Sequence, residues 1–96
     1  MKTLTLQEIY VMRAKADALM TLAKTFNTVI ELRAHLRDVC VYLERAENHA
    51  EHAQYEEAAL ECKNVFNALH RAKRNSTVGD VAYMGVIKLI ADFNEG

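Results

Sequence analysis

The chain contains no proline, and its first glycine is residue 79. The three glycines of the 96 residues are Gly79, Gly85 and Gly96. Tight β-turns and hairpins depend on these two residue types, because glycine tolerates a positive φ and proline presets the first turn position. A chain that lacks both over its first 78 residues is poorly suited to a fold of many hairpins. The sequence therefore predicts an all-α protein whose first corners are made by other residues.

The length and composition predict a single helical domain over residues 1–96. Hydrophobic residues make up 51% of the chain, which is enough for a core, and the formal net charge is −1. A charge this close to zero gives no global field that would attract the protein to nucleic acid or to anionic lipid. The longest apolar stretch, residues 81–90, is shorter than the roughly 20 residues of a membrane-spanning helix. We therefore expect no association with a membrane.

Cys40 and Cys62 are the only cysteines, and both lie on apolar faces of expected helices. Small secreted domains usually carry more cysteines, joined in several disulfides. We therefore expect two protonated, inert thiols in a cytoplasmic protein, with a disulfide between them as the alternative. Residues 1–12 favour the same location, because they lack the continuous apolar core of a signal peptide.

Apolar residues recur at helical spacing along most of the chain, and in the first expected helix they run from Ile9 to Phe26. Thr5 and Glu8 fit a capping box, which places a helix start at residue 5. Thr28 and Glu31 fit a second capping box, and Asn27 before them suits a left-handed corner. The spacing predicts a compact bundle of three to four antiparallel helices, over about residues 5–25, 28–48, 54–74 and 80–93.

The corner near residue 50 has the weakest signal. From Val29 to Ala53 the apolar residues alternate gaps of three and four, and from Tyr55 onward they continue out of phase. A turn within residues 48–54 explains this shift, and one long helix over residues 28–74 is the alternative. We favour the turn, because a single helix of that length would extend about 70 Å.

The segment from Val81 to Phe93 is apolar on nearly every side. This pattern indicates a helix covered on several sides, either by the other helices or by another chain. A strand over residues 86–90 is the alternative, because β-branched residues occur there. We take one side of this helix as the first candidate partner-binding surface, formed by Tyr83, Val86, Ile90 and Phe93.

Acidic residues gather around the corner near residue 50 and form the second candidate partner-binding surface, which would suit a basic partner. They are Glu44, Glu47, Glu51, Glu56 and Glu57. If residues 48–57 were helical, His49, His52 and Glu56 would share one face. Two imidazoles and a carboxylate can hold a divalent metal ion, so a metal-binding protein is one alternative function.

Basic residues gather at the end of the third expected helix, where Arg71, Lys73 and Arg74 either complement the helix dipole or contact nucleic acid. A small nucleic-acid-binding regulator is therefore another alternative function.

No motif for a catalytic nucleophile, a phosphate loop or a dinucleotide appears. We therefore expect no enzymatic activity and no cofactor. The favoured hypothesis is a non-enzymatic module that docks on another protein and blocks, escorts or modulates it. Small inhibitors, adaptors and chaperones, including those of phages and plasmids, are built this way. A homodimer is compatible with the same hypothesis, and nucleic acid is the less favoured partner.

Overall fold

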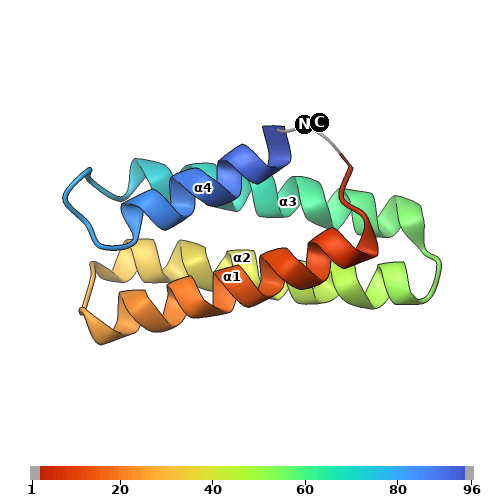
Figure 1. Ribbon diagram of the computed structural model, residues 1–96, viewed down its shortest axis with the longest axis horizontal. Helices are drawn as coiled ribbons and strands as arrows, with labels where there is room; N and C mark the ends of the chain where they lie inside the picture. Colours follow the sequence, from red (N-terminus) through yellow and green to blue (C-terminus); the bar gives the residue numbers. More distant parts are fainter. Residues whose placement is uncertain (1–2, 95–96) are drawn as a thin grey trace.

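The computed structural model describes residues 3–94 as four α-helices: α1 (Leu6–Thr25), α2 (Ile30–Glu51), α3 (Tyr55–Arg74) and α4 (Tyr83–Asn94). Consecutive helices run antiparallel (Figure 1). They pack in ring order, α1 on α2, α2 on α3, α3 on α4 and α4 back on α1. The predicted all-α bundle is confirmed. Residues 1–2 and 95–96 lie outside the described part. They include Gly96 and the first two residues of the segment 1–12, which was predicted not to be a signal peptide.

The start of α1 confirms the first capping box. The backbone N–H of Glu8 donates to the Thr5 hydroxyl at 3.2 Å, and the backbone N–H of Thr5 donates to Glu8 Oε1 at 3.0 Å. Two backbone donors that α1 itself cannot satisfy are thereby paired. Such a cap typically stabilises a helix by about 1 kcal/mol.

The second predicted capping box is wrong. Val29 is the residue that caps α2, and it forms no side-chain hydrogen bond. Thr28 closes α1 instead: its backbone N–H and its hydroxyl both donate to the Ala23 carbonyl, each at 3.1 Å. Asn27 has φ 50° and its N–H donates to Lys24, which completes a Schellman motif. Thr28 therefore serves the end of α1 rather than the start of α2.

The corner between α2 and α3 is also a Schellman motif, and it rules out the single long helix. The N–H of Gln54 donates to the His49 carbonyl at 2.8 Å, and the N–H of Ala53 donates to the Ala50 carbonyl at 3.1 Å. Ala53 has φ 58°, a left-handed conformation that usually favours glycine. The predicted turn within residues 48–54 is confirmed.

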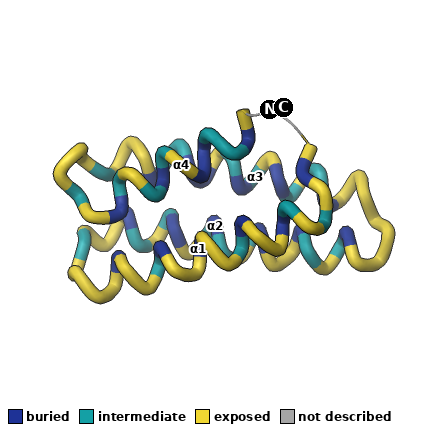
Figure 2. The backbone as a smooth tube through the Cα atoms, in the orientation of Figure 1, coloured by how far each residue is buried: buried dark blue, intermediate teal, exposed yellow. Residues whose placement is uncertain are grey.

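The buried positions follow the predicted periodicity along the inner sides of the helices (Figure 2). The largest fully buried side chains come from all four helices and include Ile9, Leu36, Leu69 and Phe93. The exceptions lie at the helix ends. They are Phe26, Val29, Ala53 and Tyr55, which the periodicity placed in the core and which are exposed.

Helix α4 begins at Tyr83, after the loop that follows α3, so the strand alternative for residues 86–90 is wrong. The helix is covered by α3 and α1 but not on every side. Val86, Leu89 and Phe93 are buried, whereas Met84 remains 56% exposed. The apolar residues of this segment therefore divide between the core and the surface.

From the left-handed conformation of Ala53 we predict that glycine at this position would stabilise the protein. A non-glycine residue with this φ loses about 1 kcal/mol relative to glycine. We expect Ala53→Gly to raise the free energy of unfolding by about that amount, measured by urea denaturation followed by circular dichroism.

Ala14→Gly is the matched control, because Ala14 is exposed in the middle of α1. Glycine there should lower the free energy of unfolding by about 0.5–1 kcal/mol. A loss of stability in both variants would contradict the left-handed corner at Ala53.

Candidate functional site

The first candidate binding surface is corrected by the structure. Val86 and Phe93 are fully buried and Ile90 is 8% exposed, while Tyr83 is half-buried. Phe93 packs edge-on against Phe66 of α3, with ring centroids 5.5 Å apart. Val86, Ile90 and Phe93 therefore attach α4 to the bundle, and of the four predicted residues Tyr83 keeps a partly exposed side chain. The sequence did not indicate this, because an all-round apolar helix does not reveal which of its faces the other helices cover.

The acidic corner lies at the end of the bundle where α2 turns into α3. Glu44, Glu51, Glu56 and Glu57 are exposed there. Glu47 is different, because it is half-buried and forms an ion pair with Arg13 of α1. The hydrogen bond from Arg13 to this carboxylate raises the pKa of the Arg13 guanidinium. Glu47 therefore joins α1 to α2. The other four predicted acids are exposed, although Glu51 also interacts with Tyr10 of α1.

The predicted metal ligands are not brought together. Helix α2 ends at Glu51, so the segment that had to be helical throughout turns instead. His49 Nδ1 lies 2.8 Å from the Gln54 side-chain oxygen, and His52 Nδ1 lies 2.7 Å from the Asn48 carbonyl oxygen. Within residues 3–94, no group of three histidine, cysteine, aspartate or glutamate side chains is placed to hold a metal ion.

Both cysteines are free thiols. Cys62 is buried, and Cys40 is half-buried beside Asp17 of α1. Burial, together with a smaller effect of the neighbouring carboxylates of Asp17 and Glu61, raises the pKa of each thiol to about 11. Both thiols are therefore protonated at neutral pH, the form that is a poor nucleophile.

A cluster of exposed hydrophobic side chains, which we call the apolar end, occupies the opposite end of the bundle. The end of α1, the start of α2 and the loop before α4 meet there (Figure 1, left). Ile30 is 70% exposed and Phe26 60%. The apolar end consists of seven residues: Leu22, Phe26, Val29, Ile30, Val78, Val81 and Met84.

The apolar end was not predicted because its members come from two separate stretches of the sequence, residues 22–30 and 78–84. Phe26 and Val29 continue the helical periodicity past the last buried turn and were therefore placed in the core. Ile30 and Val78 lie off the predicted apolar faces, and that departure was the one available signal. This signal could not be interpreted from the sequence, because the two stretches come together only when the chain reverses direction at its three corners.

Two open recesses adjoin the apolar end. The first, about 400 Å³, lies between α1 and α4 and has Lys15 and Lys88 at its edges. Its apolar part includes Leu19 and Leu89, and a Cβ atom on Gly85 would approach Leu19 Cδ1 to 2.5 Å. Glycine at residue 85 thus allows α4 to lie close to α1.

The second recess, about 310 Å³, lies between α1 and α2. Met20 and Ile30 provide its apolar side chains, and Lys24, Arg33 and Arg37 provide three cations. No carboxylate lines either of these two recesses. The polar groups around the apolar end are therefore mostly positive.

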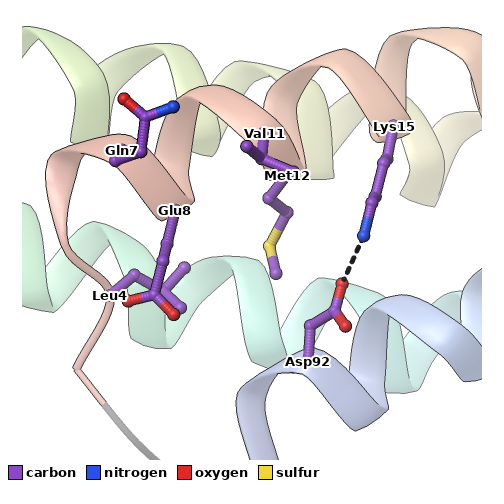
Figure 3. Close-up of a pocket in the computed structure, with 7 residues that line it drawn as sticks. All are labelled: Leu4, Gln7, Glu8, Val11, Met12, Lys15 and Asp92. Carbon is purple, nitrogen blue, oxygen red and sulfur yellow. Dashed lines mark hydrogen bonds and ion pairs between the residues drawn. The ribbon is translucent and has the colours of Figure 1, made fainter.

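A third, smaller recess of about 220 Å³ lies farther along the contact between α1 and α4 (Figure 3). The ammonium group of Lys15 lies 3.3 Å from the Asp92 carboxylate, and both residues line this recess. Leu4, Val11 and Met12 line it together with polar side chains. It is away from the apolar end and mixes both signs of charge, so it is the weaker candidate.

The charges are divided between the two halves of the bundle. The half next to the apolar end, residues 16–40 and 65–88, carries seven basic and four acidic side chains. The other half, residues 3–15, 41–64 and 89–94, carries four basic and eight acidic side chains. Arg71, Lys73 and Arg74 belong to the basic half, where Arg71 lies 4.0 Å from Asp38. Although the net charge of the chain is low, one half of the bundle is therefore basic and the other half acidic.

No protein family model, no curated protein and no solved structure matches this chain. Among residues 3–94 no helix is both long enough and apolar enough to cross a membrane.

From the raised pKa values of the Cys40 and Cys62 thiols we expect the protein to lose stability at high pH. The pKa of each thiol is about 11 in the folded protein and 9.0 as its ordinary value. Unfolding therefore releases protons between pH 9 and 11, so the free energy of unfolding should fall across that interval and be unaffected by these groups below it. Denaturant titrations at several pH values measure the slope.

The double variant Cys40→Ser, Cys62→Ala removes both thiols while leaving lysines and tyrosines to titrate as before. Its free energy of unfolding should fall less steeply between pH 9 and 11 than that of the unmodified chain. Equal slopes would show that the two thiols ionise as easily in the folded protein as in the unfolded chain.

Proposed function

We propose that this protein is a non-enzymatic helical module that binds another protein through its apolar end. The observation that carries the proposal is the gathering of seven exposed hydrophobic side chains on one end of a small bundle. Single exposed hydrophobic residues are ordinary on protein surfaces, but a group of them is typical of an interaction site. Ile30 at the start of α2 and Phe26, the residue that caps the end of α1, are the most prominent anchors, and Val78 is the most exposed large hydrophobic residue of the loop.

The energetics support this proposal. Full burial of one large apolar side chain contributes about 1.5–3 kcal/mol. A few such anchors therefore supply much of the free energy of a specific complex, after the cost of association is subtracted. The hydrophobic core does not depend on these side chains, since the largest buried residues lie elsewhere. Their exposure is thus better explained by a partner than by folding.

The proposed mode of action is steric. The apolar end covers a site on the partner and thereby blocks, escorts or modulates it, and no chemical step is required. A second copy of the chain is one such partner, which would make the protein a homodimer. A nucleic-acid-binding regulator is the competing proposal, because Arg71, Lys73 and Arg74 lie in the basic half. Hydrophobic side chains such as Ile30 and Val78 do not pair with phosphates, which favours a protein partner.

Site-specific photocrosslinking tests the proposal. A photoreactive amino acid replaces Ile30 in one variant and Glu57 of the acidic corner in another, and each variant is expressed in the cells that normally produce the protein. We expect a protein crosslinked from position 30 in stoichiometric yield and none from position 57, as identified by mass spectrometry. Crosslinking from position 57 alone would transfer the interface to the acidic corner.

A matched pair of substitutions measures the contribution of the apolar end. Ile30→Ser should weaken the captured complex about tenfold or more, which corresponds to roughly 1.4 kcal/mol. Leu60→Ser is the control, because Leu60 is also largely exposed, at 61% against 70% for Ile30, but lies outside the apolar end. If neither position yields a protein, or only nucleic acid is crosslinked, the proposal fails. A crosslink between two copies of the pure chain identifies the homodimer.

A further inference from the structure

Three cations line the recess between α1 and α2. Lys24, Arg33 and Arg37 form no ion pair with any carboxylate of residues 3–94. The ion pairs of the described residues involve other side chains: Arg13 with Glu47, Lys15 with Asp92, and Arg71 with Asp38. The recess is therefore a local site of positive potential beside the apolar end.

This arrangement works against the stability of the isolated chain. Arg33 and Arg37 are four residues apart on α2, a spacing at which like charges repel each other and disfavour the helix. The Nε atom of Arg33 is buried and has no hydrogen-bond partner in the described part of the chain. A buried donor without an acceptor is unfavourable. Both features would be relieved by an anionic group placed in the recess.

Apolar side chains surround these cations. Met20 and Ile30 line the same recess, and Phe26 and Val29 lie in the corner between α1 and α2. A phosphate alone would satisfy the cations but leave these side chains in water. A ligand that presents apolar groups together with acids satisfies both parts of the surface.

We propose that the recess between α1 and α2 binds an acidic amphipathic segment of a partner protein. Apolar side chains of the segment cover Ile30 and Met20, and its carboxylates pair with Lys24, Arg33 and Arg37. The inference rests on the proposed function and adds the chemistry by which the partner is recognised. Peptide segments of this kind commonly dock as helices in a groove, and charges at the rim steer them and set specificity.

Charge exchange between protein and peptide tests this proposal. The probes are two fluorescent helical peptides with an identical leucine face, flanked in one by glutamates and in the other by lysines. Fluorescence anisotropy should show that the protein binds the glutamate peptide about tenfold more tightly or better, with the difference shrinking at high salt. The double variant Lys24→Glu, Arg37→Glu should bind the lysine peptide more tightly.

The matched control is the double variant Arg45→Glu, Lys63→Glu, which makes the same change of net charge at exposed residues of the acidic half. It should keep the preference for the glutamate peptide. Ile30→Ser should weaken the binding of both peptides and leave the ratio of their affinities unchanged, because it removes apolar contact only. Circular dichroism of each variant checks that the bundle is intact.

Several outcomes would overturn the inference. These are equal affinity for the two peptides, binding of neither, or a preference that survives the charge reversal at Lys24 and Arg37. Tighter binding of a single-stranded oligonucleotide or of phosphatidylserine vesicles, abolished by the same reversal, would assign the recess to nucleic acid or to lipid. If position 30 still crosslinks to a protein in those cases, the proposed function stands and only the acidic character of the partner is refuted.

Discussion

The structure depends on two helix ends that are closed without glycine. Asn27 and Ala53 adopt positive φ, and each allows the carbonyls of a helix end to be paired by the N–H groups that follow. Because these Schellman motifs reverse the chain after α1 and after α2, the first three helices lie antiparallel. The third connection is of a different kind: Asp80 accepts a hydrogen bond from the Thr77 N–H at 2.6 Å in a loop that contains Gly79.

This alternation of direction gathers distant segments at one place. The corner between α1 and α2 and the loop between α3 and α4 meet at the same end of the bundle (Figure 1). Residues near 26–30 and near 78–84 are thereby brought to one surface although about 50 positions separate them. The surface is therefore a product of the topology, and no single segment of the sequence carries it.

This difference explains what could be predicted from the sequence. Local signals succeeded: the Thr5 cap, the corner near residue 50 and the buried faces of α1 to α3 each depend on residues a few positions apart. Thr28 was misassigned because a hydroxyl between two helices can cap the second or close the first, and the Ala23 carbonyl decides between them. Phe26 and Val86 were misplaced because periodicity identifies an apolar face but not the neighbour that covers it.

The packing of the bundle also bears on the proposed function. A ring of four helices needs only one face of each helix for its core, and the helix ends lie beyond that core. Hydrophobic residues at the ends are thus not needed for the core, and a group of them gathered at one end is more typical of an interaction site than of a helix end. Here one end holds Ile30, Phe26 and Val78 among unpaired cations, while the other holds exposed carboxylates. That asymmetry is not required by the bundle, which is why we attribute it to recognition.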